Sequence, residues 1–338
     1  MDKNQIALDE KLMRRCIQLA KCGRNLARPN PMVGCVIVAD GRIIGEGYHV
    51  RCGEGHAEVN AFATVKSDDE HLLPQATLYV SLEPCSHHGK TPPCSDLIIR
   101  KGVRRVVVGC IDPFSEVQGR GIQRLRDAGI DVTVGVLEAE CRWLNRRFFT
   151  FHEKNRPYII LKWAQTADGF IDCDGKPLAI STPFTKMLVH KLRAEEDAIL
   201  VGRVTDEREH PQLNVRVWCG KSPVRFVLSR SEERGTESEE RGKIWVNSFE
   251  ELFRECREKK LQSLIVEGGR ETLQSFIDQD LWDEIRVERP LPLTPSPKGE
   301  GETFDKNENS TPAPQLPDNA VLFKQQIFGN NTISNYQK

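Results

Sequence analysis

The chain has 338 residues, a hydrophobic fraction of 38% and a formal net charge of −1 at pH 7. This length predicts two domains, and a charge so close to zero gives no electrostatic reason to expect a nucleic-acid partner. No apolar run of 18 residues occurs, and no apolar stretch follows positive charge at the start, so we expect neither membrane insertion nor export. The eleven cysteines then indicate reduced thiols in a cytoplasmic protein.

The first part of the chain is predicted to alternate between strands and helices after an initial hairpin. Asp9 is the expected N-cap of the first helix, which Gly23 ends. In chain order we expect a helix at 10–22, strands at 32–39 and 42–47, a helix at 56–66, a strand at 77–82, a helix at 95–101, a strand at 105–110, a helix at 117–128, a strand at 131–136 and a helix at 138–152. This order predicts a mixed sheet that is covered on both faces.

Three residues of this part are candidates for metal ligands. His56 opens the sequence His56-Ala57-Glu58, and Cys85 and Cys94 are the two ends of a segment that Pro84 precedes. One imidazole and two thiolates are the ligands of a catalytic zinc ion that keeps its fourth position for water. His-x-Glu followed by Pro-Cys-x-x-Cys is typical of zinc deaminases, in which the glutamate moves protons and does not bind the metal. Here eight residues separate the two cysteines, so the pattern is met with a variation.

Other interpretations of the pattern are open. Among eleven cysteines, two can fall near each other by chance, and Cys16, Cys35 and Cys110 lie in apolar segments typical of a core. A deaminase of tRNA or free nucleosides would share the motif, but the neutral charge and a second domain argue against it. A structural zinc site would not need Glu58 beside the open position. We therefore expect a hydrolytic deaminase with Glu58 as its acid and base.

The segments Asn30–Gly34, His56–Glu58 and Glu83–Cys94 together resemble the bifunctional deaminase/reductase family of riboflavin biosynthesis, the RibD type. The resemblance implies an α/β protein with a cytidine-deaminase-like domain over 1–152 and a dihydrofolate-reductase-like domain over 153–338. It implies that the first domain uses Zn²⁺ to deaminate a diamino-phosphoribosylamino-pyrimidinone, a small phosphorylated substrate. It implies that the second domain reduces the ribosyl group with NADPH, and that the protein is a homo-oligomer, either a dimer or a tetramer.

The deaminase substrate would be held by polar residues near the motif. Asn30 is expected to hydrogen-bond the ring or the ribose. His49, His87, Lys90 and Thr91 are candidates for ribose or phosphate contacts, and simple exposure to solvent explains each of them equally well.

A second pattern of strands and helices begins at Pro157. Strands are expected at 158–164, 198–201, 224–228, 243–246 and 264–266, and helices at 183–194, 249–259 and 272–277. Thr182 and Pro183 indicate a helix start, because proline is favoured at the first helical position. Residues 231–242 are mostly charged or small and are expected to form a solvated loop.

The turn Val266-Glu267-Gly268-Gly269 follows a predicted strand and could bring backbone N–H groups to a phosphate. With Leu161-Lys162-Trp163-Ala164 it resembles the reductase domain of the family. By this resemblance NADPH would contact Ala164, Thr205, Glu209, Gly269, Arg270, Glu271, Thr272, Leu273, Gln274 and Ser275. The substrate would contact Arg193, Leu213, Arg216 and Glu267.

The second domain also departs from the family. The run from Thr205 to Pro211 replaces the usual Thr-x-x-x-Asp-Asp-Pro, and Ser229 replaces an aspartate. The pattern stops at Arg289, and the proline-rich residues from Pro290 to Glu302 are expected not to form a strand. The family pattern could resume at 313–317 and 328–331. A deaminase that has lost its reductase activity is therefore the alternative.

Overall fold

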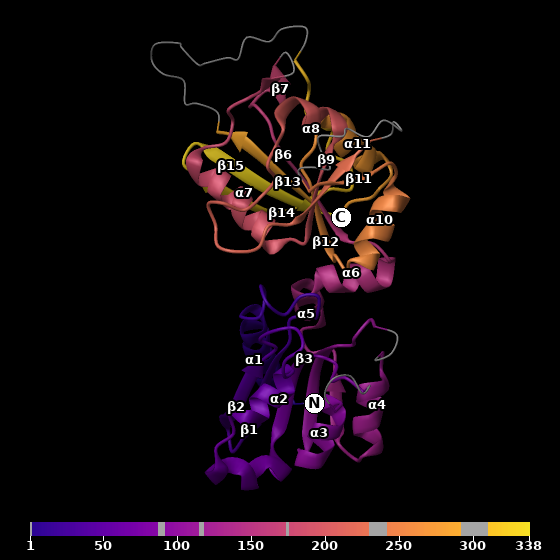
Figure 1. Cartoon of the computed structure of the whole chain (residues 1–338). Coiled ribbons are helices and arrows are strands. Elements are labelled where there is room, and N and C mark those ends of the chain that lie inside the picture. Colours follow the sequence, from indigo (N-terminus) through magenta and orange to yellow (C-terminus); the bar gives the residue numbers. More distant parts are fainter. Residues whose placement is uncertain (1, 87–91, 115–117, 174–175, 230–241, 292–309) are drawn as a thin grey trace, which may run out of the picture. The chain divides into compact units, whose positions relative to one another are not determined.

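The computed structural model describes residues 2–86, 92–114, 118–173, 176–229, 242–291 and 310–338. The chain forms two compact units, Met1–Asn155 and Arg156–Lys338 (Figure 1). Within the described ranges, no helix combines the length and the apolar character that crossing a membrane requires.

The first unit is built on a five-stranded mixed sheet in the order β2-β1-β3-β4-β5. Strand β1 is antiparallel to both of its neighbours, β2 and β3, and the pairs β3–β4 and β4–β5 are parallel. The strands are β1 (Gly34–Ala39), β2 (Arg42–Tyr48), β3 (Thr77–Leu82), β4 (Arg105–Cys110) and β5 (Asp131–Val134). The helices are α1 (Lys3–Lys21), α2 (Ala57–Ala63), α3 (Cys94–Lys101), α4 (Arg120–Asp127), α5 (Glu138–Leu144) and α6 (Arg146–Lys154), with a 3₁₀ segment, η1 (Ser67–Gln75).

Both faces of this sheet are buried, because successive side chains of a strand point to opposite faces. Leu78 on β3 and Val106 on β4 pack with α2, α3 and α4 in one core. Tyr79 and Val107, each one residue later, pack with α1, α5 and α6 in another. The predicted mixed sheet with two covered faces is confirmed.

Two details of the first unit differ from the prediction. The first helix begins at Lys3, so Asp9 lies within α1 and is 1% exposed instead of capping the helix. The single helix predicted at 138–152 is two helices, which meet at Asn145. The Asn145 amide exchanges two hydrogen bonds of 2.8 Å with the backbone of Met32. This long-range contact holds Asn145 outside helical geometry, and neighbouring residues in the sequence give no sign of it.

The second unit contains an eight-stranded sheet in the order β11-β10-β9-β12-β6-β13-β15-β14. The pairs from β11 to β13 are parallel, and the last two pairs are antiparallel. The strands are β6 (Tyr158–Ala164), β9 (Ala198–Gly202), β10 (Val224–Leu228), β11 (Ile244–Val246), β12 (Ser263–Val266), β13 (Glu284–Pro290), β14 (Val321–Phe328) and β15 (Asn331–Gln337). A small separate pair joins β7 (Asp172–Cys173) and β8 (Lys176–Pro177).

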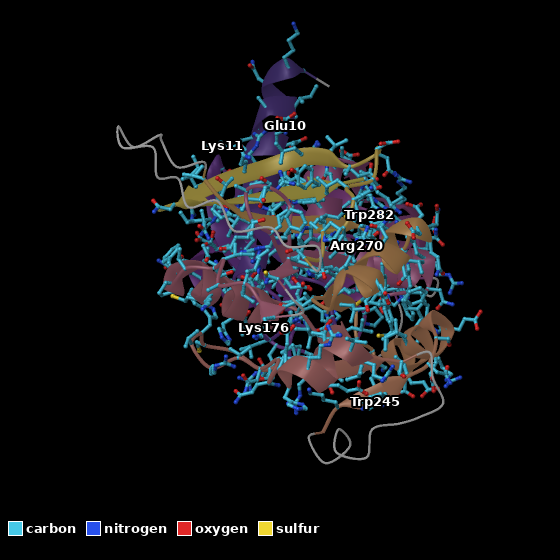
Figure 2. All side chains as sticks on the ribbon, turned by 90° about the horizontal axis from the view of Figure 1, so that it is seen from above. Glu10, Lys11, Lys176, Trp245, Arg270 and Trp282 are labelled. Atoms are coloured by element: carbon cyan, nitrogen blue, oxygen red, sulfur yellow. The ribbon has the colours of Figure 1, made fainter. Side chains whose placement is uncertain are left out.

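Helices cover both faces of this sheet as well. Ile159 and Leu161 of β6 pack in a core with α10 (Phe249–Glu258) and α11 (Arg270–Asp278), together with the fully buried Trp282 (Figure 2). Ile160 packs on the other face with α7 (Pro183–Glu195), whose N-cap Thr182 accepts a hydrogen bond from the N–H of Thr185. A further helix, α8 (Arg203–Glu209), follows β9 directly.

The end of the chain differs from the prediction. Strand β13 continues through Arg289 to Pro290, which pairs with Asn331 of β15. Beyond the undescribed residues 292–309, the chain forms the last two strands of the sheet. The expected loop over 231–242 and most of the proline-rich segment lie outside the described residues, so their predicted conformations stay predictions.

Candidate metal centre and cofactor cavity

The three predicted metal ligands come together at one end of the first sheet. His56 is the N-cap residue of α2, and Cys94 is the first residue of α3. Cys85 follows the carboxyl end of β3. This is where open α/β sheets commonly bind ligands, beyond strand ends and at helix starts.

The geometry of this cluster fits zinc. The Nδ1 atom of His56 lies 3.5 Å from Sγ of Cys85 and 3.3 Å from Sγ of Cys94, and all three ligand atoms lie within 4.8 Å of one another. A tetrahedral zinc ion with ordinary Zn–N and Zn–S bond lengths separates such a nitrogen and sulfur by about 3.5 Å. The donor set and its spacing therefore suit a tetrahedral ion with one position left for another ligand.

One thiol of the cluster is held in its ionised form. Hydrogen bonds from Cys94 and from His56 lower the pKa of Cys85 to about 4 despite burial, so this thiol is ionised at neutral pH. The Cys85 thiolate in turn raises the pKa of His56 to about 9. A buried thiolate is the form of cysteine that binds metals.

Glu58 lies beside these ligands on the first turn of α2. Its side chain is 3% exposed, and burial raises the pKa of the carboxyl to about 7. The positive charge of a bound metal ion would act in the opposite direction. Either way, the structure places the carboxyl next to the ligands in a site from which water is largely excluded.

Two of the predicted substrate contacts lie close to this cluster. His49 is 3% exposed, and its ring meets the ring of His56 edge to face at 5.4 Å. Its Nδ1 lies 3.2 Å from the carbonyl of Gly55, and its Nε2 lies 3.2 Å from the side-chain nitrogen of Asn30. Burial lowers the pKa of His49, which favours the neutral imidazole. His87, Lys90 and Thr91 lie outside the described residues.

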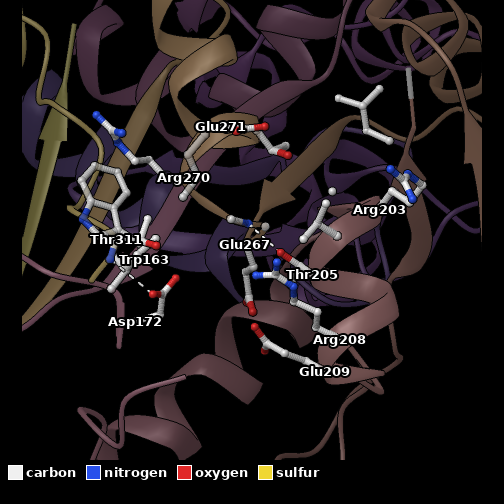
Figure 3. A pocket seen from close by; sticks show the side chains of 18 of the residues that line it. Trp163, Asp172, Arg203, Thr205, Arg208, Glu209, Glu267, Arg270, Glu271 and Thr311 are labelled. Carbon is white, nitrogen blue, oxygen red and sulfur yellow. Dashed lines mark hydrogen bonds between the residues drawn. The ribbon is translucent and has the colours of Figure 1, made fainter. Parts of the chain in front are cut away.

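The second unit contains a cavity of about 930 Å³ (Figure 3). Its wall includes the end of β6, the start of α8 and the turn that leads into α11. Gly268 packs so closely that a Cβ there would lie 2.4 Å from the backbone nitrogen of Gly202. The Thr205 hydroxyl accepts a hydrogen bond of 3.0 Å from the N–H of Gly269, which fixes α8 against that turn.

Most of the predicted cofactor residues line this cavity. They are Ala164, Thr205, Glu209, Gly269, Arg270, Glu271, Thr272, Leu273 and Ser275. Gln274 is not among the lining residues, and its side chain bonds to Asp278 and to the backbone of Gln315.

Of the predicted substrate contacts in this unit, only Glu267 lines the cavity. Arg193 bonds to Glu267 at 2.7 Å. Leu213 is buried in the core, and Arg216 bonds to Gln212 and Asn214.

Two carboxyl groups of this wall, Glu267 and Glu209, differ in their electrostatics. Burial alone would raise the pKa of Glu267, but Lys162 and Arg193 outweigh that effect, so the pKa of Glu267 is lowered and the group is ionised. Glu209 behaves in the opposite way, since burial and the nearby Asp172 raise the pKa of that carboxyl. The cavity thus combines Glu267, whose pKa is lowered, with Glu209, whose pKa is raised and which takes up a proton more readily.

Several lining residues were not predicted from the sequence. Those with charged or hydroxyl side chains are Lys162, Asp172, Arg203, Arg208 and Thr311, whereas Ser229, which the sequence places near the cofactor, also lines the cavity. Thr311 comes from the far side of the proline-rich segment, and its N–H bonds to Asp172 at 3.3 Å (Figure 3). The motif around β6 contains Lys162 and could have indicated it, but no sequence signal places Thr311 at this site.

Comparison with known proteins identifies both units. A family model described as the cytidine and deoxycytidylate deaminase zinc-binding region matches residues 6–110. The model of the RibD C-terminal domain matches residues 157–288. The chain is 38% identical over 324 residues to the riboflavin biosynthesis protein RibD of Aquifex aeolicus, covering 87% of this chain and 89% of that protein. It is 40% identical over 278 residues to the riboflavin biosynthesis protein RibD of Escherichia coli, covering 77% of this chain and 74% of that protein.

Solved structures show the same likeness over the whole chain. A diaminohydroxyphosphoribosylaminopyrimidine deaminase/5-amino-6-(5-phosphoribosylamino)uracil reductase from Thermotoga maritima aligns with a TM-score of 0.82 at 33% identity, covering 98% of this chain and 99% of that chain. Acinetobacter baumannii RibD aligns with a TM-score of 0.84 at 27% identity over the same shares. The chain therefore belongs to the RibD family, the bifunctional deaminases and reductases of riboflavin biosynthesis.

Proposed function

We propose that the first unit is a zinc-dependent deaminase that acts on a diaminohydroxyphosphoribosylaminopyrimidine, the substrate named for the Thermotoga maritima relative. The observation that carries this proposal is the cluster of His56, Cys85 and Cys94 with Glu58 buried beside it. A zinc ion bound there supplies a Lewis acid that activates water at neutral pH.

The protein's own groups then move the protons. Glu58 accepts the two protons of the attacking water in turn and delivers one to the ring nitrogen and the other to the departing ammonia, as general acid and base catalysis requires. Water is consumed and ammonia released, so an amino group on the ring is replaced by a carbonyl. Asn30, whose side-chain nitrogen lies 3.2 Å from Nε2 of His49, would hydrogen-bond the substrate.

We propose further that the cavity of the second unit binds NADPH and the deaminated product, and that the ribosyl group is reduced there. NADPH supplies the hydride. The volume lies at the upper end of the range for ligand sites, which suits a dinucleotide with a substrate beside it. The first turn of α11, which begins at Arg270 in the cavity wall, provides a helix N-terminus of the kind that binds phosphate. Arg203, Arg208 and Arg270 offer guanidinium groups to a phosphate, in a wall that also contains four carboxyl groups.

The charge of Glu267 is compensated by Arg193, which fixes the carboxylate in one orientation. A carboxylate held in this way can accept hydrogen bonds from substrate hydroxyls or amines. Glu209 and Ser229 are two of the departures from the family pattern. Both line the cavity, so these substitutions change the side chains of its wall and leave the cavity open.

Separate assays of the two reactions test this assignment. Glu58→Gln is expected to retain zinc and lose deamination by about 10²-fold or more, while NADPH oxidation with deaminated substrate is unchanged. Glu54→Gln, which alters an exposed carboxylate four residues earlier, is the matched control. Deamination by Glu58→Gln at the wild-type rate would remove Glu58 from the mechanism. Absence of NADPH oxidation in the wild type would leave a deaminase with a reductase-like second unit.

A further inference from the structure

Glu83 is a buried carboxylate that the deamination mechanism does not use. It is 4% exposed and lies between β3 and Cys85, in the sequence Glu83-Pro84-Cys85. One oxygen accepts hydrogen bonds from the N–H groups of Asp112 at 3.3 Å and Gly119 at 2.9 Å. The other accepts from the N–H groups of Gly121 at 2.9 Å and Ile122 at 3.3 Å. A single side chain therefore joins the metal-ligand turn to the start of α4.

Helix α4 also contacts the residues on either side of Cys85. Its first turn packs against the preceding residue so closely that a Cβ on Gly121 would lie 2.0 Å from the carbonyl oxygen of Pro84. One turn later, the Arg124 guanidinium donates to the carbonyl of Ser86, the residue after Cys85, at 3.4 Å.

The same arginine reaches the helix that carries the other thiolate. Arg124 forms an ion pair of 2.8 Å with Asp96, which lies two residues after Cys94 on α3. Figure 1 shows α3 and α4 as neighbours within the first unit. Both sulfur ligands are thus tied to one short helix, although Cys85 and Cys94 belong to different elements.

We propose that Glu83 and Arg124 are positioning residues, which set the placement of the Cys85 and Cys94 sulfurs for the metal through α4. This inference rests on the proposed zinc site. Metal affinity depends on such supporting hydrogen bonds, and their loss typically lowers it by about 10- to 100-fold. A carboxylate is required at position 83 because all four partners are donors. An amide of the same shape would turn an NH₂ group toward two N–H groups, so it would lose acceptors and add repulsion.

The test measures zinc release to a chelator from the full-length protein, together with the absorption spectrum of the cobalt-substituted form. Glu83→Gln is expected to release zinc about 10-fold faster or more, and to shift the thiolate-to-cobalt bands. Arg124→Met is expected to accelerate release by about two- to fivefold, the scale of one partly exposed ion pair. Arg126→Met, on the same helix but directed to the backbone of Val132, is the matched control and should behave as wild type.

These readouts separate positioning from simple stabilisation. A purely structural role would lower the unfolding temperature of Glu83→Gln and leave the zinc release rate and the cobalt spectrum of the folded protein unchanged, and that result would overturn the proposal. If Glu83→Gln fails to fold, the zinc release rates of Arg124→Met and Arg126→Met are compared instead. Equal release rates in these two variants would overturn the proposal. A wild-type protein that binds neither zinc nor cobalt would instead refute the proposed metal site.

Discussion

Replacing Asp9 by asparagine distinguishes sharply between two roles for this residue. The carboxylate accepts hydrogen bonds from both terminal nitrogens of Arg105, at 2.9 and 2.7 Å, from the Tyr79 hydroxyl at 2.8 Å and from Gln5 at 2.8 Å. If Asp9 were a helix N-cap, as the sequence suggests, asparagine would serve equally well, since the two residues are equivalent there. In the structure the charge itself is what Arg105 binds.

The expected cost follows from the burial of the pair. Removing one partner of a buried ion pair costs about 3–5 kcal/mol. The Arg105 side chain is 14% exposed, against 1% for Asp9, so water can partly replace the lost contact. We therefore expect Asp9→Asn to lower the free energy of unfolding by about 2–4 kcal/mol. For a unit of this size that corresponds to a fall of about 4–16 °C in the unfolding temperature.

Differential scanning calorimetry of the full chain measures this effect, with the transition of the second unit as an internal control. The difference from wild type should also depend on pH. Burial acts to raise the pKa of Asp9, but the hydrogen bonds from Arg105, Gln5 and Tyr79 outweigh it, so the folded-state pKa lies below the ordinary value of 3.8. The stabilisation is therefore complete above that value and is lost as the pH falls through the folded-state pKa. A shift of less than about 2 °C at neutral pH would refute the ion-pair argument.

Two further predictions concern the metal and the tail. Cys85→Ser is expected to lose zinc and deamination activity together. The control is Cys110→Ser, at a buried thiol outside the ligand cluster, which should keep both. Elemental analysis showing full zinc in Cys85→Ser would contradict the ligand assignment. Truncation after Leu291 should abolish NADPH binding and leave deamination unchanged, because it removes Thr311 from the cavity wall and the Asn331 amide that donates to buried Glu288 at 2.6 Å. Deletion of residues 293–302 should leave NADPH binding intact. If calorimetric titration with NADPH finds that the truncated and the deleted proteins bind it alike, the role of Thr311 and Asn331 in the cavity is refuted.

The sequence correctly predicts those strands whose bounds are determined by a local run of apolar side chains. The strands Thr77–Leu82, Arg105–Cys110, Tyr158–Ala164 and Val224–Leu228 have the bounds expected from their apolar runs. The candidate ligands could also be found, because cysteine and histidine at a metal site are constrained by coordination chemistry. Asp9 was misplaced because its partner, Arg105, is 96 residues away.

The far end of the reductase sheet shows the same limit. In the sequence, Pro290 indicates that the strand ends before it. In the structure it is the last residue of β13 and pairs with Asn331 of β15. Proline is tolerated at such a position when its missing donor is not needed by the ladder. Thr311 likewise reaches the cavity because its backbone bonds to Ile171 and to Asp172, which lies 139 residues earlier in the chain. Local sequence patterns contain no information about such a contact.

The two anchors that flank residues 292–309 make this part of the chain a suitable place for foreign sequence. On one side the Leu291 N–H bonds to the carbonyl of Asn330, and on the other the carbonyl of Thr311 accepts from Ile171 at 3.0 Å. Both anchors belong to the sheet and the cavity wall, so they persist whatever length joins them. For any flexible chain that joins two fixed ends, doubling the length costs only about 0.6 kcal/mol. A fluorescent protein or an affinity tag could therefore be carried inside the chain here, whereas removal of the carboxyl-terminal strands would take away part of the reductase cavity.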